Sequence, residues 1–245
     1  MVLTRKLREN WLRLLTHVGA LIPLALLAWD YWGGHLSVNP IQDITLRTGK
    51  AALVLLVLSL ACTPINSVFG FRPVLRVRRP LGLYAFMYVG LHFLIFIGLD
   101  YGFDLVLIRE AVLEKRYALV GFAAFLLLLP LAVTSTKGWM RRLGRLWKRL
   151  HRAVYAAALL VVVHFVWLVK SDIREPLLFG AIVVLLLVLR IPRVRKSVSH
   201  FRSWFKGNVS QKTSSFAKLT LSKWSKHDML KSHSSLQQGG HPRPD

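Results

Sequence analysis

Six long apolar stretches, separated by short polar segments, dominate this sequence and decide its fold class. A helix needs about 20 mainly apolar residues to cross the ~30 Å hydrocarbon core of a bilayer. An apolar segment in lipid must also satisfy its backbone hydrogen bonds internally, so each stretch is predicted to be an α-helix. The six predicted spans run over Trp11–Tyr31, Thr45–Thr63, Leu81–Leu99, Tyr117–Val133, Ala153–Val169 and Pro176–Ile191.

Composition supports lipid as the main solvent of this chain. Hydrophobic residues make up 54% of its 245 residues, more than is usual for a soluble domain. The net charge of +23, from 34 Lys and Arg against 11 Asp and Glu, would suggest nucleic acid as the partner of a soluble protein. Here the basic residues lie between the apolar stretches, where they orient helices and contact anionic headgroups. We therefore expect membrane lipids as partners and no nucleic acid.

The loops predict an orientation. Residues 65–80 and 136–152 carry four and seven Lys or Arg and no acid, whereas eight of the eleven acidic residues lie in the alternate loops. Positively charged loops stay in the cytoplasm. The sequence therefore predicts an all-α integral membrane protein, a bundle of six transmembrane helices with both termini cytoplasmic.

The polar ends of the chain are predicted to flank this bundle. Residues 1–10 form a cytoplasmic basic head, and the first apolar stretch reads as a retained helix, because it is long and no small-residue cleavage site follows it. Residues 11–191 form the membrane domain. Residues 192–245 form a basic, Ser/Lys-rich cytoplasmic tail, which is partly disordered from residue 232 onward.

Two histidines inside the spans are the leading functional candidates. Ionisable side chains in a membrane are costly, and a neutral imidazole is a good axial ligand for haem iron. His92 and His164 each lie about 13 residues from the cytoplasmic end of their span, or ~20 Å along it. Two imidazoles at one depth can bind the two faces of one haem. The alternative is that both are unrelated interior residues that hydrogen-bond to neighbouring helices. The single cysteine, Cys62, excludes a thiolate cluster from this chain alone.

Two further histidines are weaker candidates for a second haem ligand or a cofactor neighbour. His151 ends a basic loop, where an interfacial histidine needs no special explanation, and ideal helix geometry does not place it on the face of His164. His17 lies in the first span, where a structural role is the main alternative.

Electrons would have to reach such a haem from a separate donor, because the sequence has no nucleotide-binding motif. Basic residues near the cytoplasmic face are candidates to bind haem propionates or a flavin phosphate. The alternative for most of them is contact with lipid headgroups. These candidates are Arg78, Arg79, Arg145, Arg149 and Arg152, together with Arg141, Arg142 and Lys148.

Several short motifs resemble those of a known family. In order they are Arg47-Thr48-Gly49, Thr63-Pro64, Arg78-Arg79 before Leu81-Gly82-Leu83, His92, Thr134-Ser135-Thr136, and Leu143-Gly144-x-x-Trp147-x-x-Leu150-His151-Arg152 followed by His164. Their order and spacing, over about three quarters of the chain, resemble the ferric-reductase-like transmembrane superfamily. Within it the chain is most similar to the MsrQ (YedZ) family, the haem-binding membrane subunits of the bacterial periplasmic methionine sulfoxide reductase system.

The resemblance implies a function. Such a subunit would lie in the bacterial inner membrane, bind b-type haem and FMN, and pass electrons to a periplasmic molybdopterin-containing catalytic subunit. A cytoplasmic flavin reductase or a quinol would be the donor. Dihaem relatives carry a histidine where this chain has Arg78, so a second haem with two histidine ligands is not implied. Two other functions stay open: a transmembrane ferric reductase and a transporter whose histidines relay protons.

Overall fold

The chain is described by a computed structural model that covers residues 2–169 and 172–194. In this part of the chain every regular element is helical. The predicted tail, residues 192–245, lies almost wholly outside the described residues. The predicted head does not form a separate element, because its residues 2–10 belong to the first helix.

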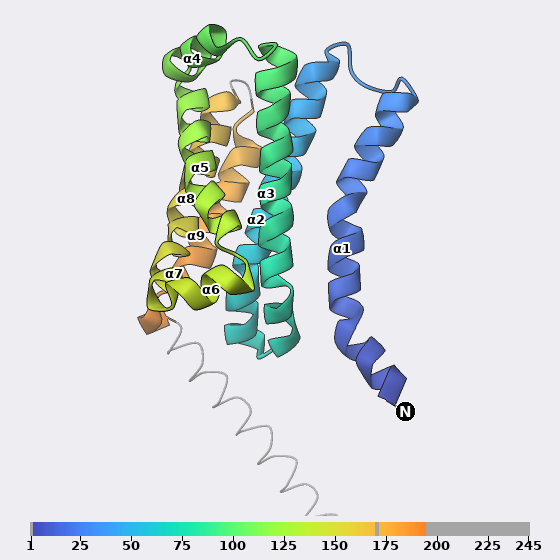
Figure 1. The fold of residues 1–245 in the computed structure, drawn as a ribbon, viewed down its shortest axis with the longest axis vertical. Coiled ribbons are helices and arrows are strands. Elements are labelled where there is room, and N and C mark those ends of the chain that lie inside the picture. The colour runs from blue at the N-terminus through green and yellow to red at the C-terminus, as the bar shows by residue number, and fades with distance from the viewer. Residues whose placement is uncertain (1, 170–171, 195–245) are drawn as a thin grey trace, which may run out of the picture. The chain divides into compact units, whose positions relative to one another are not determined.

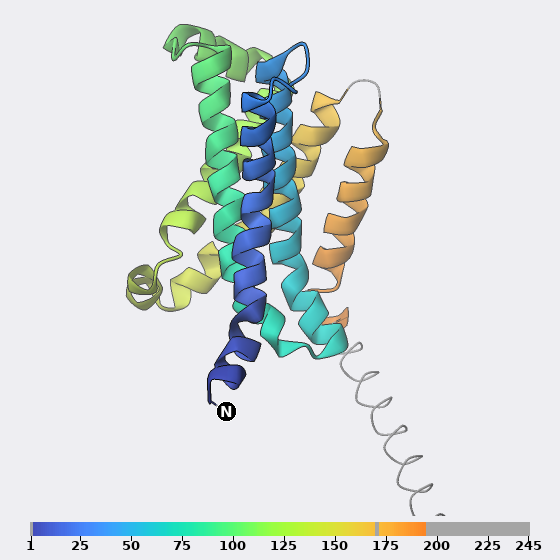
Figure 2. The ribbon, with the colours of Figure 1, turned by 90° about the vertical axis from the view of Figure 1, so that its right-hand side faces the viewer.

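Long helices make up the bundle, and short ones connect them (Figures 1 and 2). The long helices are α1 (Val2–Trp32), α2 (Pro40–Phe69), α3 (Arg78–Ile95), α5 (Arg116–Val133), α8 (Ala153–Leu168) and α9 (Arg174–Val188). The short elements are the 3₁₀ turn η1 (Arg72–Arg76), the π-helical turn η2 (Phe96–Asp100), α4 (Leu105–Glu114), α6 (Lys137–Leu143) and α7 (Arg145–Leu150).

Five helical segments are long and apolar enough to cross a membrane: Trp11–Trp32, Pro40–Phe69, Arg78–Asp100, Arg116–Val133 and Arg145–Leu168. These agree with the first five predicted spans. The sixth predicted span corresponds to α9, which has 15 residues. At 1.5 Å per residue α9 is about 22 Å long, which is shorter than the hydrocarbon core. The sixth crossing and the sidedness of the termini therefore stay predictions.

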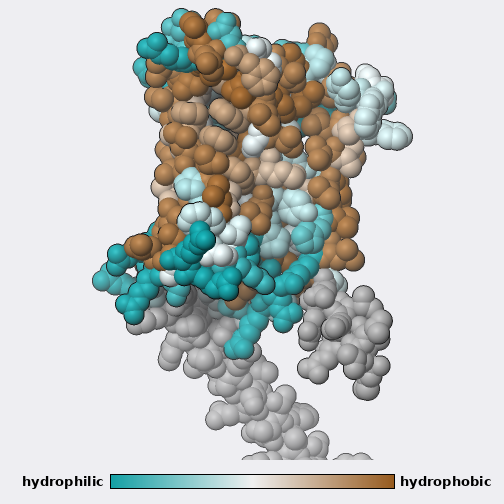
Figure 3. Space-filling view, in the orientation of Figure 1, coloured by the Kyte–Doolittle hydropathy of each residue, from teal (hydrophilic) through white to brown (hydrophobic). Residues whose placement is uncertain are grey.

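The two ends of the bundle differ in charge. We call the end formed by residues 30–43, 100–115 and 172–175 the acidic end, because it contains all eight acidic residues between positions 11 and 194. We call the end formed by residues 70–77 and 134–152 the basic end. Figure 3 shows an apolar belt above the hydrophilic side chains of the basic end. This distribution suits a protein with lipid around its middle and water at its ends.

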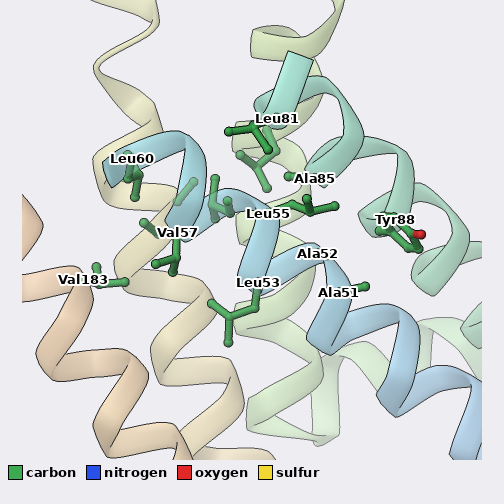
Figure 4. Packing of buried hydrophobic residues seen from close by; sticks show 14 of the residues in the cluster. Ala51, Ala52, Leu53, Leu55, Val57, Leu60, Leu81, Ala85, Tyr88 and Val183 are labelled. Atoms are coloured by element: carbon green, nitrogen blue, oxygen red, sulfur yellow. The ribbon is translucent and has the colours of Figure 1, made fainter. Parts of the chain in front are cut away.

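The core lies around α2, the helix with the most buried residues. Its side chains pack against α3 on one side and against α8 and α9 on the other, where Val57 of α2 faces Val183 of α9 (Figure 4). In α1, by contrast, Ala20 is the one described side chain that belongs to the buried core. Lipid therefore contacts most of α1, and its position depends on a few specific contacts.

One such contact is the hydroxyl of Tyr88 on α3, which inserts into the hydrogen-bond ladder of α1. It donates to the carbonyl oxygen of Ala20 at 2.8 Å and accepts from the amide of Leu24 at 3.0 Å. An uninterrupted helix would join those two groups directly. Pro23 lies beside them and lacks an amide proton, so the ladder is already weakened there. Tyr88 is 1% exposed, and it fixes the position of α1 against α3.

Candidate functional site

His92 on α3 and His164 on α8 lie side by side inside the bundle. Their ring centroids are 6.2 Å apart and their planes are nearly perpendicular, at 86°. The two residues are far apart in sequence and lie on different helices, so only the packing of the bundle brings them together. The two imidazoles predicted to share a depth therefore also share a site.

Each ring is fixed by one backbone carbonyl. The Nδ1 atom of His92 lies 2.9 Å from the carbonyl oxygen of Thr45, and that of His164 lies 2.7 Å from the carbonyl oxygen of Tyr117. A carbonyl oxygen can only accept, so in each ring Nδ1 carries the proton and donates. The lone pair of a neutral imidazole then lies on Nε2, the atom that can bind a metal.

A glycine one helical turn after each carbonyl makes room for the ring. A side-chain carbon at Gly49 would lie 3.1 Å from Nδ1 of His92, and one at Gly121 would lie 2.7 Å from Nδ1 of His164. Real side-chain carbons almost never approach closer than 3.0 Å. Any larger residue at Gly121 would therefore have to displace the imidazole.

The two halves of the site have the same arrangement, and each half-site consists of one histidine, one backbone carbonyl and one glycine. In each, the carbonyl precedes the histidine by 47 residues, and the glycine follows the carbonyl by four. The hairpin of α2 and α3 supplies one half-site, and α5 with α8 supplies the other. The residues that supply the carbonyls are unlike, Thr45 and Tyr117, because only their backbone atoms form the hydrogen bond, so the shared arrangement is not visible in these residue types. This arrangement also explains the glycine of the Arg47-Thr48-Gly49 motif, because Gly49 leaves space for the ring of His92.

The two rings line a cavity of about 600 Å³ between α2, α3, α5 and α8. This volume lies in the range typical of sites that enclose small molecules and cofactors. Aromatic rings form much of its wall, and Phe93 stacks on Phe125 with ring centroids 4.6 Å apart. An apolar wall with two imidazoles aimed into it suits a flat, mainly hydrophobic ligand with a metal at its centre.

We call the part of the cavity that is lined by residues at or near the acidic end its mouth, and two lysines line it. Lys50 forms an ion pair with Glu175 at 2.6 Å, and Lys115 donates to the hydroxyl of Tyr101 at 2.8 Å. The Tyr101 hydroxyl raises the pKa of the Lys115 ammonium, which therefore stays charged. Sequence reasoning missed both lysines. The available signal was that Lys50 is a charged residue inside a predicted span and that Lys115 lies just before one.

The residues fit a haem. Two imidazoles that bind one iron from opposite faces, each through a metal–nitrogen bond of about 2 Å, have ring centroids roughly 6 Å apart. The observed separation of 6.2 Å matches. Within the described residues, no group of three or more His, Cys, Asp or Glu could hold a bare metal ion. A metal between His92 and His164 would thus need further ligands, and a porphyrin supplies four.

The arginines proposed as anion partners do not line this cavity, since they lie at the basic end. The side chains of Arg79, Arg145, Arg149 and Arg152 are exposed there, whereas Arg78 is half-buried and donates to the hydroxyl of Thr63 at 3.3 Å. The assignment of these arginines to haem propionates or a flavin phosphate near the basic end stays a prediction. The cations beside that cavity come from α2 and from the start of α5.

His151 and His17 do not join the pair. The ring of His151 stacks on Trp147, with centroids 4.0 Å apart, and its buried Nε2 atom has no hydrogen-bond partner among the described residues. His17 meets the hydroxyl of Tyr84 at 2.9 Å through Nδ1. Neither histidine lines the cavity, and each has its own partner.

Hydrogen bonds and a glycine turn explain which residues make up the motif around His151. The indole of Trp147 donates to the carbonyl oxygen of Thr134 at 3.0 Å, which holds α7 against the end of α5. Thr136 caps α6 by accepting from the amide of Trp139, and Gly144 joins α6 to α7 with a φ of 49°, which favours glycine. The motif therefore shapes the basic end and orients the ring of His151.

Comparison with known proteins gives one consistent family. Residues 48–162 match the model of the ferric reductase like transmembrane component. The haem-binding subunit MsrQ of protein-methionine-sulfoxide reductase from Xanthomonas euvesicatoria pv. vesicatoria (strain 85-10) is 49% identical over 183 residues, which are 72% of this chain and 84% of that relative. The subunit of the same name from Rhodospirillum rubrum is 46% identical over 191 residues, 77% of this chain and 92% of the relative. No solved structure matches.

Proposed function

This multi-pass bacterial membrane protein belongs to the family of haem-binding MsrQ subunits of protein-methionine-sulfoxide reductase, and we propose that it carries electrons through a b-type haem between His92 and His164. Haem iron, when bound, takes up and releases one electron at a time. The proposal rests on one observation above all. Two imidazoles with fixed tautomers have centroids 6.2 Å apart across an apolar cavity.

The chain's own residues hold and tune this site. The carbonyl oxygens of Thr45 and Tyr117 accept the Nδ1 protons, which orients both rings and makes each Nε2 a better electron donor to a metal. Phenylalanines exclude water from the cavity, and Lys50 and Lys115 at its mouth provide positive charge for the carboxylates of a porphyrin.

The electron route has an entrance and an exit. We propose that the basic end is cytoplasmic, by the positive-inside rule, and that a flavin reductase or a quinol delivers electrons there, with FMN as a carrier. The cavity mouth opens at the acidic end, which would then be periplasmic. A periplasmic molybdopterin-containing catalytic subunit would collect the electrons and reduce methionine sulfoxide. The chemistry on the substrate would belong to that partner.

A reduced-minus-oxidised visible spectrum of the purified protein tests the haem. We expect sharp b-type bands in the wild type and their loss in His92→Ala and in His164→Ala. His35→Ala is the matched control, because His35 is an exposed histidine in the loop between α1 and α2, and it should leave the spectrum unchanged. Bands that survive in both core variants would reject these ligands.

The same preparation separates the alternatives. A proton-coupled transporter would show no haem bands in the wild type. A ferric reductase would transfer electrons to chelated ferric iron, whereas the proposed subunit should reduce its periplasmic partner faster than it reduces the chelate.

A further inference from the structure

Two arginines at the basic end are bound to a single turn of α2. Arg78, from the start of α3, donates to the hydroxyl of Thr63 at 3.3 Å, and Arg190, just after α9, donates to the carbonyl oxygen of Leu60. Residues three apart in a helix lie on one face, so both guanidinium groups lie beside the same stretch of α2. The buried Cys62 lies between those two positions of α2.

Tyr155 of α8 holds the second guanidinium in place. Arg190 lies over the Tyr155 ring, 5.1 Å from its centroid, and donates to the Tyr155 hydroxyl at 3.0 Å. Because that oxygen accepts from Arg190, the phenol proton stays available for a further acceptor. Arg190 is half-buried, and its Nε atom is buried without a hydrogen-bond partner among the described residues.

The charge of this cluster is not balanced by the described side chains. The acidic residues between positions 11 and 194 are at the other end of the bundle, and neither Arg78 nor Arg190 has an acidic partner among the residues whose side chains the structure describes. Like charges that are partly buried near one another repel each other. An anion between them would remove this cost.

We propose that Arg78, Arg190 and Tyr155 form a binding site for a phosphate group at the basic end. A guanidinium has five N–H donors, of which the described contacts use two in Arg190 and one in Arg78. The remaining donors and the phenol proton suit the several oxygens of a phosphate. Two sources share this chemistry: a free phosphate monoester such as FMN, and the headgroup of an anionic phospholipid. The FMN source rests on the proposed function, whereas the lipid source does not.

The site extends what sequence reasoning assigned. Arg78 is a candidate for phosphate binding from the sequence, whereas Arg190 lies inside the last predicted span, Pro176–Ile191, and was not a candidate. Three elements far apart in sequence, α3, α8 and the residues after α9, contribute one donor group each. The three donor groups come together only when α9 packs against α2.

Binding of FMN to the full-length protein tests the proposal. The probe is the quenching of flavin fluorescence during titration of protein in phosphatidylcholine nanodiscs, with and without added phosphatidylglycerol, and inorganic phosphate is the competitor. Arg190→Gln and Arg78→Gln should each weaken FMN binding about tenfold or more, because each removes charge-assisted hydrogen bonds. Arg72→Gln is the matched control, since Arg72 is an exposed arginine of η1 at the same end of the bundle, and should bind FMN as the wild type does.

The lipid source gives a different pattern. If the anion is a headgroup, added phosphatidylglycerol raises the melting temperature of the wild type, and Arg190→Gln and Arg78→Gln lose that increase while FMN binding does not change. Wild-type behaviour of both variants in both assays would overturn the site. Loss of haem along with the loss of binding would also overturn it, because the anion would then be a porphyrin carboxylate.

Two further measurements distinguish loss of the phosphate site from misfolding of a variant and from failure of the proposed haem function. Arg190→Lys retains the charge and should recover part of the binding, whereas a variant that fails to fold would show no rescue. Absence of haem bands in the wild type would reject the proposed function but leave a phosphate site intact.

Discussion

Gly121 of α5 touches the imidazole of His164 so closely that a methyl group at its position would lie 2.7 Å from Nδ1 and 2.8 Å from Cε1. The same ring donates to the carbonyl oxygen of Tyr117, one turn earlier in α5. One helical turn therefore both holds the ring and leaves space for it. The equivalent turn of α2 does the same for His92 with slightly more room, because a side-chain carbon at Gly49 would lie 3.1 Å from that ring.

Gly121→Ala should displace His164 and reduce the haem content or convert part of the haem from low-spin to high-spin. Gly49→Ala should have the same effect to a smaller degree, since its contact is looser. Haem per protein and the electron paramagnetic resonance spectrum measure both. Gly90→Ala on α3 is the control, because a side-chain carbon there meets nothing within 4 Å. Equal haem spectra for Gly121→Ala and Gly90→Ala would show that the close contact does not position the ligand.

Tyr88→Phe should destabilise the protein by about 1–3 kcal/mol, because it leaves the carbonyl of Ala20 and the amide of Leu24 without their partner in a region that water does not reach. Thermal unfolding in detergent measures this. Tyr84→Phe removes the corresponding hydroxyl one turn away, whose partner His17 is exposed, and should cost less. A larger loss for Tyr84→Phe would contradict the role given to Tyr88.

Lys115→Gln and Lys50→Gln should each lower the midpoint potential of the haem. A positive charge near the iron disfavours the oxidised state, which is the more positive one, so removal of a lysine stabilises the oxidised haem. We expect a decrease of about a few tens of millivolts, because water partly screens charges at the cavity mouth. Spectroelectrochemical titration gives the potential. Lys137→Gln at the basic end is the control, and an equal shift there would exclude a local effect.

Trp147→Phe should loosen the basic end, because it removes the hydrogen bond to the carbonyl oxygen of Thr134 but keeps an aromatic ring beside His151. The cost is about 1 kcal/mol for one neutral hydrogen bond. Hydrogen exchange of residues 137–152 should become faster. Trp139→Phe, at an exposed tryptophan of α6, should leave the exchange unchanged. Unchanged exchange in Trp147→Phe would show that the indole does not hold α7 in place.

Local features predicted the spans and the two central histidines. Hydropathy placed five membrane helices correctly, because each apolar run must form a helix by itself in lipid. Counting residues along two helices gave His92 and His164 a common depth, since the rise per residue is constant. The sixth predicted span, Pro176–Ile191, overlaps α9, which begins two residues earlier and ends three residues earlier, at Val188.

The contacts that complete each site could not be predicted. A backbone carbonyl such as that of Tyr117 leaves no trace in the residue type, and Gly121 is one glycine among sixteen. Nothing in the sequence indicated that Lys50, within a predicted span, and Lys115, in a predicted loop, would line one cavity. Their roles depend on which helix lies beside which.

The amino-acid sequence by itself determined that this chain is a helical membrane protein with imidazoles buried at one level, because hydrophobicity and helical rise are properties of each segment alone. The tertiary structure decided that His92 faces His164 and that Arg78 and Arg190 share one turn of α2. Those pairings depend on how each helix is rotated about its axis and on which neighbours it packs against, and these are set by the fit of side chains between helices.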